Sequence, residues 1–300
     1  MADYKQALVK DGKNPEGIIV FPAFITQKQM DALKDFRVGD RDTFVVAYPK
    51  SGTTWMEQIV HLLANNGEQG EKVLSEAVPW LEGAATRYGG LENLIKTPGD
   101  RRYFHTHLPL SLMPMFGETK AKYIYVARNP KDNAVSYYYH ALSKMGYEGS
   151  WSEFITLYRE GKVAYGSIFD HVFDWWKASQ HSDNVMFVKY EDMKKNLAQV
   201  VTDVASFIDI PLTSDLLDTV VAASDFSAMA INPKANLDWV PQREGIPKHM
   251  RKGIVGDWKN HFSSEETSIF DAIYQSRMVE FGLEFEFELS YENVELRIKN

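Results

Sequence analysis

Short apolar runs alternate with amphipathic stretches along most of the chain. Three of these runs are rich in β-branched and aromatic residues and predict buried strands, at 43–47, 122–128 and 185–190. Each is followed by a stretch with helical spacing of its apolar residues, at 56–63, 133–145 and 196–208. This alternation predicts an α/β fold with a central, mostly parallel sheet flanked by helices.

The remaining pattern is less regular. We expect short strands at 17–22 and 102–109 and helices at 26–36 and 264–281, with further helical turns between 146 and 184. Residues 64–102 and 225–256 are rich in Gly and Pro, which is typical of long functional loops. The tail 283–289 alternates with period two and predicts an edge strand or an extended packing segment.

Aromatic residues occur in two of these less regular regions. Trp175 and Trp176 follow apolar residues at helical spacing, so we interpret both as core. Trp80 belongs to the first loop region, where it either lines a pocket or packs in the core.

The stretch between the first predicted strand and its helix has the chemistry of an anion cradle. It reads Tyr-Pro-Lys-Ser-Gly-Thr-Thr-Trp over residues 48–55. A strand, a tight loop and a helix in that order direct backbone N–H groups and the positive helix end to one point. Gly52 permits close backbone approach, Lys50 adds a positive charge, and Trp55 is placed to stack on a base. Three residues supply hydroxyl groups: Ser51, Thr53 and Thr54.

This cradle differs from the Walker A loop, where the lysine follows the second glycine of the motif. Here Lys50 precedes the only glycine, Gly52. Taken alone, the octet is also compatible with an ordinary strand–turn–helix whose Lys and Thr residues are only solvated or capping.

Length and composition limit the number of domains and the kinds of partner and metal site. The chain has 300 residues, 44% of them hydrophobic, which suffices for one large α/β domain or two small ones, and no linker or repeat marks a boundary. We therefore expect a single domain over 1–300. The net charge of −8 argues against general nucleic-acid binding. The absence of cysteine excludes disulfides and thiolate metal sites.

The termini and hydropathy favour a cytoplasmic protein. The N-terminal residues lack the apolar core of a signal peptide. No apolar run approaches the roughly 20 residues of a membrane span, so we expect no membrane partner.

Two histidines stand at i and i+2 in the predicted strand at 102–109. His105 and His107 would therefore share one face, and a zinc pair has to be considered. We do not expect one, because no cysteine exists and no acidic partner stands at the usual motif spacing.

Basic residues recur at two later points. Arg128 ends the second predicted strand and Ser136 lies on the following helix, so both can face the crevice at the carboxyl edge of the sheet. Arg251 and Lys252 precede Gly253 and form a local anion site in an acidic chain. Taken alone, Arg128 and Ser136 are better explained as ordinary surface residues, and the pair at 251–252 could equally be a solvated basic pair.

Taken together, these motifs resemble the cytosolic sulfotransferases, which use 3′-phosphoadenosine 5′-phosphosulfate (PAPS) as donor and release 3′-phosphoadenosine 5′-phosphate (PAP). The matching segments occur in family order and are 48–55, 106–109, 126–132 with 136–138, 190–193, 251–253 and 256–259.

The resemblance implies a role for each matching residue. Residues 50–55 would hold the 5′-phosphosulfate, with Trp55 against the adenine. His107 would be the catalytic base, with Lys50 and Ser136 also in the catalytic group. The 3′-phosphate would be bound by Arg128, Ser136, Arg251, Lys252 and Gly253. The adenosine pocket would be completed by Tyr190, Ser224, Phe226 and Met229. The acceptor pocket would involve Trp80, His105, His107 and His140.

The implied chemistry agrees with these residue types. A neutral histidine near pH 7 can accept the proton of an attacking hydroxyl. Lys50 and backbone N–H groups can stabilise charge on the leaving phosphate. The transferred sulfuryl group carries less charge than a terminal phosphoryl group, so we expect no metal ion.

The chain also departs from the family pattern. Many members have Lys two positions before the catalytic histidine, where this chain has His105. A partly charged His105 could substitute below its reference pKa of about 6.5. The family's dimer signature, Lys-x-x-x-Thr-Val-x-x-x-Glu, lacks its Thr, Val and Glu in residues 259–268. We therefore expect a monomer or an atypical homodimer.

The acceptor and two other functions remain open at this stage. His140 makes the pocket more polar than a steroid site, but phenols, alcohols, sterols and amines all stay possible acceptors. A P-loop small-molecule kinase would explain the strand–loop–helix, although it lacks the Walker A order and an evident magnesium-binding Asp. A nucleotide-binding protein without catalysis would leave His107 purely structural.

Overall fold

The computed structural model describes residues 6–10, 18–84, 89–95 and 101–289. Its centre is a sheet of four parallel strands in the order β4-β3-β5-β6. Their bounds are Tyr103–Thr106 (β4), Thr43–Ala47 (β3), Lys122–Ala127 (β5) and Val185–Lys189 (β6). The chain adds strands on both sides of β3, so the carboxyl end of β3 is the point where open α/β folds bind ligands.

Alternate residues of the strands point into two separate cores. In β3, Phe44 and Val46 belong to one core, and Val45 and Ala47 belong to the other. All five β3 residues are buried. Because both faces of the sheet are covered, the strands are continuous apolar runs.

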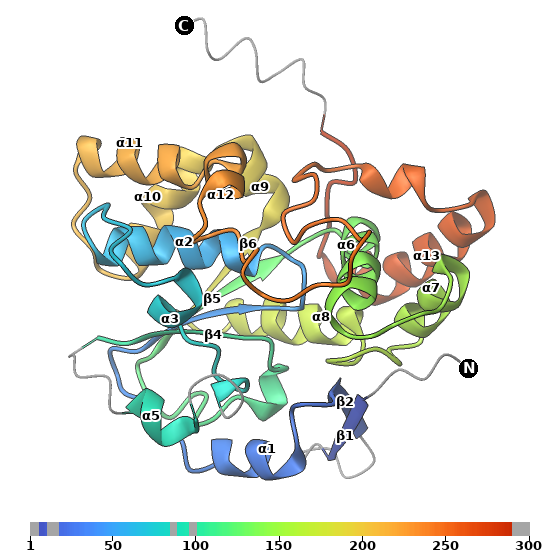
Figure 1. The fold of residues 1–300 in the computed structure, drawn as a ribbon, viewed down its shortest axis with the longest axis horizontal. Coiled ribbons are helices and arrows are strands. Elements are labelled where there is room, and N and C mark those ends of the chain that lie inside the picture. The colour runs from blue at the N-terminus through green and yellow to red at the C-terminus, as the bar shows by residue number, and fades with distance from the viewer. Residues whose placement is uncertain (1–5, 11–17, 85–88, 96–100, 290–300) are drawn as a thin grey trace, which may run out of the picture.

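Helices cover the two faces in two groups (Figure 1). One face packs against α2 (Thr53–Ala64), α9 (Tyr190–Lys195), α10 (Leu197–Phe207) and α11 (Ser214–Ala223). The other packs against α1 (Gln27–Leu33), α6 (Pro130–Lys144), α7 (Trp151–Arg159), α8 (Ile168–Ser179) and α13 (Ser264–Arg277). The fold class predicted from the sequence is therefore confirmed.

Local signals define several helix starts. Thr26, Ser150 and Ser263 each accept a backbone hydrogen bond and form a capping box with the residue three positions on. Asn129 caps α6, with Pro130 in its first turn. Trp175 is fully buried and Trp176 packs partly buried against the same core, as predicted.

The structure corrects the prediction of two wholly irregular regions. The first region contains the short helices α3 (Leu74–Ala77) and α5 (Leu91–Ile95), and the second contains α12 (Phe226–Ile231). Helix α11 was not predicted; it begins at Ser214, three residues after Pro211, with Thr213 as its N-cap. A separate antiparallel pair consists of β1 (Gln6–Lys10) and β2 (Ile18–Pro22).

Three short 3₁₀ turns complete the described elements. The 3₁₀ turns are η1 (Leu110–Leu112), η2 (Asp257–Asn260) and η3 (Val279–Phe281). The tail at 283–289 forms no strand; it is extended, with Leu283 and Phe285 buried against the core.

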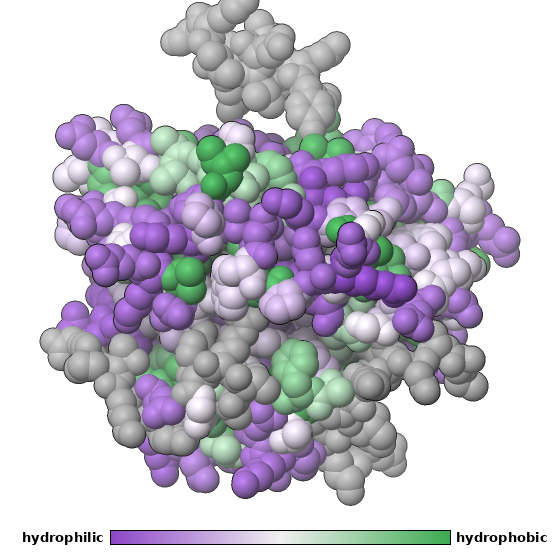
Figure 2. All heavy atoms as spheres, viewed as in Figure 1, coloured by the Kyte–Doolittle hydropathy of each residue, from purple (hydrophilic) through white to green (hydrophobic). Residues whose placement is uncertain are grey.

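The molecular surface viewed in Figure 2 is mostly hydrophilic, with hydrophobic side chains scattered among the polar ones. Among the described residues, no helix has the length and apolar character needed to cross a bilayer.

Candidate active site

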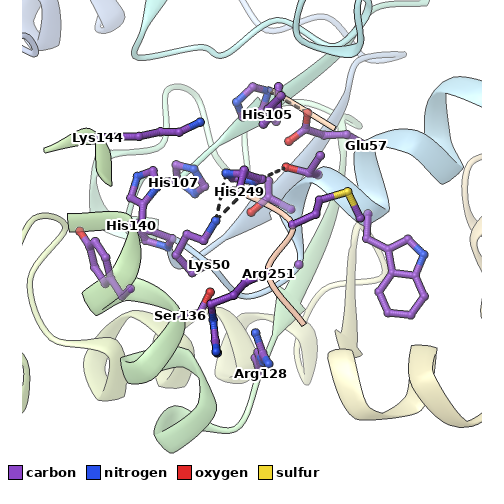
Figure 3. Close-up of a pocket in the computed structure, with 18 of the residues that line it drawn as sticks. Lys50, Glu57, His105, His107, Arg128, Ser136, His140, Lys144, His249 and Arg251 are labelled. Atoms are coloured by element: carbon purple, nitrogen blue, oxygen red, sulfur yellow. Dashed lines mark hydrogen bonds and ion pairs between the residues drawn. The ribbon is translucent and has the colours of Figure 1, made fainter. Parts of the chain in front are cut away.

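A cavity of about 300 Å³ opens at the carboxyl ends of the four parallel strands. Each strand contributes at least one lining residue within three positions of its end: Lys50 after β3, His107 after β4, Arg128 after β5 and Tyr190 after β6. One cavity therefore brings together three basic side chains that are far apart in sequence: Lys50, Arg128 and Arg251 (Figure 3).

The loop between β3 and α2 approaches the cavity with its backbone. Gly52 caps α2 with φ of 113°, and a Cβ atom there would lie 2.9 Å from the Tyr190 ring. Thr53 and Thr54 line the cavity. Ser51 does not line it, because its side chain is buried and its Oγ accepts a hydrogen bond of 2.9 Å from Asn133 Nδ2. The Ser51 hydroxyl thus stabilises the loop from behind.

Lys50 lies at the centre of the positive charge. Its Nζ is 3.2 Å from Nδ1 and 3.3 Å from Nε2 of His249, which belongs to the loop after α12. Burial lowers the pKa of Lys50 to about 7, and nearby Lys144, Arg128 and Arg251 contribute. An anion in the cavity would favour the protonated amine.

Hydrogen bonds from its ring and from its backbone N–H hold His107 in one orientation. Its Nδ1 donates to the Ala47 carbonyl at 2.8 Å, so the neutral ring presents the lone pair of Nε2 as its free proton acceptor. Its backbone N–H donates to Glu82 Oε1 at 2.8 Å. Burial lowers the pKa of His107 below its ordinary value of 6.5, although Glu82 opposes this. The imidazole is therefore neutral at pH 7.

A hydrogen-bond chain fastens His107 to the interior. His171 Nε2 donates to the His107 carbonyl at 3.0 Å, so the neutral His171 ring accepts at Nδ1 from the Tyr125 hydroxyl, 2.8 Å away. Burial lowers the pKa of His171 to about 4, which keeps this pattern of donors and acceptors fixed.

Arg128 joins the end of β5 to the loop before η2. Its guanidinium lies 4.4 Å from the centre of the Tyr190 ring and donates to the Ile254 carbonyl at 3.0 Å. Asp132, in the first turn of α6, accepts from the backbone N–H groups of Gly256 (2.7 Å) and Trp258 (2.9 Å). These contacts bring the basic turn at 251–253 beside the strand ends.

Both basic side chains of that turn are oriented by Asp257. Its carboxylate accepts from Arg251 at 2.5 Å and from Lys252 at 2.6 Å, and the pKa of Asp257 is far below its usual range because these hydrogen bonds outweigh its burial. Gly253 has φ of 65°, and a Cβ atom there would be 2.3 Å from the Phe226 ring. Only glycine lets the turn lie flat on this ring.

Several buried polar atoms around the cradle have no hydrogen-bond partner among the described residues. They include Trp55 Nε1, Thr53 Oγ1, Arg128 Nε and Ser224 Oγ. Ser224 itself does not line the cavity, whereas Phe226 and Met229 do. Because buried polar groups normally have partners, this set fits a bound polar ligand with several acceptor groups.

The opposite part of the cavity has a different composition. Trp80, His105 and His140 line it, with Phe24, Tyr165 and His249. The His105 ring stacks on Trp80 with centroids 6.1 Å apart and donates from Nδ1 to the Val78 carbonyl at 2.8 Å. Trp80 thus lines the pocket and also packs against the core.

The predicted site residues are therefore brought together, with two exceptions. All of them line the one cavity except Ser51 and Ser224. Five further residues that shape the cavity were not predicted: Glu82, Lys144, His171, His249 and Asp257. His249 and Asp257 flank the basic turn within a few residues, which is the only sequence signal that could have identified them.

His105 and His107 do share one face, with ring centroids 6.1 Å apart. In the described part of the chain, no third His, Asp or Glu side chain joins any such pair to form a metal-binding group.

Comparison with known proteins gives concordant matches. The sequence model of the sulfotransferase domain matches residues 40–282. Mouse sulfotransferase 1B1 is 40% identical over 289 residues, covering 92% of this chain and 95% of the relative. Human sulfotransferase 1E1 is 35% identical over 285 residues, covering 91% and 95% respectively.

Two solved structures have the same arrangement. Retinol dehydratase in complex with retinol and PAP has a TM-score of 0.80 at 25% identity and covers 91% of each chain. The mouse sulfotransferase SULT7A1 with PAP has a TM-score of 0.71 at 28% identity and covers 87% of this chain and 91% of that one.

Proposed function

The chain belongs to the cytosolic sulfotransferase family, and from this premise we propose which of its residues perform the reaction. The enzyme transfers a sulfuryl group from PAPS to a small-molecule acceptor. One observation carries the assignment of residues: His107 presents Nε2 to the same cavity in which Lys50, Arg128 and Arg251 gather.

The donor occupies the cradle side of the cavity. PAPS supplies the sulfuryl group and leaves as PAP. Lys50, Gly52, Thr53 and Thr54 bind the 5′-phosphosulfate end. Arg128, Ser136, Arg251, Lys252 and the Gly253 backbone bind the 3′-phosphate. The adenosine lies against Trp55, Tyr190, Phe226 and Met229, with Ser224 as a hydrogen-bonding group at its edge. The unpartnered buried atoms around the cradle support this placement.

His107 accepts the proton of the acceptor hydroxyl at Nε2. Its lowered pKa keeps the ring neutral at pH 7, as a general base requires. Lys50 stabilises the charge that develops on the leaving phosphate, because a cation already in place costs no reorganisation during the reaction. Ser136 orients the donor from α6, and Ser51 supports the loop through Asn133.

The wider assignment follows the same premise. We propose one sulfotransferase domain over residues 1–300, acting in the cytoplasm without nucleic-acid or membrane partners. We propose a monomer or atypical homodimer, because Ser263 and Glu266 use the region of the dimer signature as a helix cap instead. His105, His140 and Trp80 form walls of the acceptor pocket.

The test is sulfate transfer from radiolabelled PAPS to a panel of phenols, alcohols, sterols and amines. His107→Ala should lower kcat by about 10²- to 10⁴-fold, the usual contribution of a general base. PAP binding, measured by calorimetry, should change little. His181→Ala, at an exposed position two residues after α8, is the matched control and should retain wild-type turnover.

Two results would reject the assignment. Sulfate transfer by His107→Ala at the wild-type rate would show that another group is the base. Phosphoryl transfer from ATP and magnesium, with no product from PAPS, would favour the kinase instead.

A further inference from the structure

One face of α6 runs from the donor side of the cavity to the acceptor side. Ser136, His140 and Lys144 are four residues apart and lie on the same helical face. All three line the main cavity, and all three also line the small hollow beside it. Since α6 rises about 1.5 Å per residue, Lys144 lies about 12 Å along the axis from Ser136.

Lys144 brings a positive charge to the acceptor end of this face. It lies in the last turn of α6, where the helix dipole favours a cation. Its charge acts on Lys50, His140 and His249 and contributes to the lowered pKa of each. Figure 3 shows its side chain extending toward the histidines.

Two neutral imidazoles accompany this cation. The rings of His140 and His249 are 6.2 Å apart and approach edge to face. Burial, with the neighbouring lysines, holds the pKa of both well below the ordinary value, so each ring carries one N–H donor at pH 7. His249 comes from the loop after α12, so helix and loop supply donors to one place.

Most of the charged side chains that line the cavity are cationic. The described lining residues include five cationic side chains: Lys50, Arg128, Lys144, Arg251 and Lys252. The same lining contains one carboxylate, that of Glu57, which is 3.7 Å from His105 Nδ1 and only 4% exposed. Four of the cations face the phosphate and sulfate groups of the donor under the proposed function. Lys144 is the fifth and lies beyond them.

We propose that the acceptor is a hydroxyl compound that also carries a carboxylate, with Lys144 as the ionic partner of that carboxylate and His140 and His249 as hydrogen-bond donors to it. This inference rests on the proposed function and specifies its substrate class. The acceptor hydroxyl lies at His107 Nε2, and its anionic arm extends along the α6 face toward Lys144. The acceptor is therefore recognised at both ends.

The same cavity also contains one group that would favour the opposite charge on the acceptor. The Glu57 carboxylate would favour an acceptor with a cationic arm. Glu57, however, lies beside His105 on the far wall from α6, and its side chain is nearly covered. The Glu57 carboxylate and the Lys144 ammonium group therefore favour acceptors of opposite charge.

The experiment compares phenols that differ only in the charge of one arm. The series is 4-hydroxyphenylacetate, its neutral amide and tyramine, extended by 3-(4-hydroxyphenyl)propanoate and its amide to vary the reach. We expect kcat/KM for the carboxylates to exceed that for the matched amides by about tenfold or more, because charge-assisted hydrogen bonds are about twice as strong as neutral ones. Tyramine should be the poorest acceptor.

Variants of Lys144 then assign the preference. Lys144→Met should lower the carboxylate-to-amide ratio by about tenfold, Lys144→Arg should retain it, and Lys144→Glu should move it toward tyramine. Lys34→Met removes the same charge from an exposed site, 71% accessible, and should leave the ratio unchanged. Thermal unfolding checks that each variant is folded.

The inference is overturned if the wild type prefers the amides or tyramine, or if Lys144→Met keeps the carboxylate preference. If no member of the series is sulfated, binding to the PAP-loaded enzyme decides, and carboxylates that bind no tighter than their amides overturn it. A chain that neither binds PAP nor transfers sulfate to any acceptor would instead reject the proposed function.

Discussion

The donor and acceptor halves of the cavity are built in different ways. The half that we assign to the donor uses residues next to strand ends, such as Lys50 and Arg128, and a glycine turn pressed on Phe226. The acceptor half uses side chains that reach in from a helix and from loops, among them Trp80, His140 and His249. The first half is fixed by the sheet, whereas the second depends on how distant segments pack.

The largest effect on nucleotide binding should come from the 3′-phosphate site. Arg251→Ala should weaken PAP by about a hundredfold, because a charge-assisted contact to phosphate is lost and such contacts contribute about 1.5–3 kcal/mol each. Binding of 5′-AMP should change by less than about threefold. Calorimetric titration of both nucleotides measures the difference, and equal weakening would show that the 3′ site is elsewhere.

A glycine pair tests whether the donor half is the more rigid one. Gly253→Ala should weaken PAP by about tenfold, because the new Cβ would be 2.3 Å from Phe226 and the residue would remain at positive φ. Gly245→Ala, in the same loop, also has positive φ but meets no atom within 4 Å. It should leave PAP affinity unchanged within about twofold. Similar losses for the two variants would mean that the Phe226 contact is unimportant.

A smaller effect should be the pH dependence of PAP affinity, which arises from Lys50 in the donor half. Lys50 has a pKa of about 7, and a bound anion raises it, so binding above pH 7 takes up a proton. PAP affinity should therefore fall by about fivefold between pH 7 and pH 8. Calorimetry in two buffers with different ionisation enthalpies measures the uptake. Lys50→Met should remove this pH dependence, and a wild type without proton uptake would contradict the prediction.

The smallest effect should come from His105 on the acceptor wall. His105→Ala removes a ring stacked on Trp80 and should raise the acceptor KM by about threefold, as expected for an aromatic contact of about 0.5–1 kcal/mol. If His105 performs the role of the family's lysine, turnover of this variant should also fall in acidic buffer. Turnover that matches the wild type over the acidic range would dismiss that role.

Prediction from the sequence succeeded where structure is determined locally. The run at 43–47 and the octet after it specify β3, the cradle and the start of α2 within 13 residues. Arg128 and Asn129 likewise end β5 and cap α6. Such segments carry their own strand, turn and cap signals, so their arrangement could be inferred without tertiary contacts.

The other parts of the site depend on contacts between residues that are far apart in the sequence. Lys50 and His249 are 199 positions apart, and no local pattern predicts that their nitrogens lie within 3.3 Å. Ser51 has a hydroxyl group of the kind that binds ligands, but this hydroxyl accepts a hydrogen bond from Asn133 of α6. Lys144 was inconspicuous because a cation in the last turn of a helix is common.

The attachment of His107 through His171 to Tyr125 has a consequence for how such an enzyme can diversify. The imidazole is hydrogen-bonded to the Ala47 carbonyl at the end of β3, and the His107 carbonyl is bonded through His171 to Tyr125, whereas much of the outer acceptor wall consists of loop segments such as residues 237–250. Those segments can be exchanged by transplantation from a relative, or can drift during evolution, while the base keeps its position. New acceptors can thus be acquired without rebuilding the chemistry.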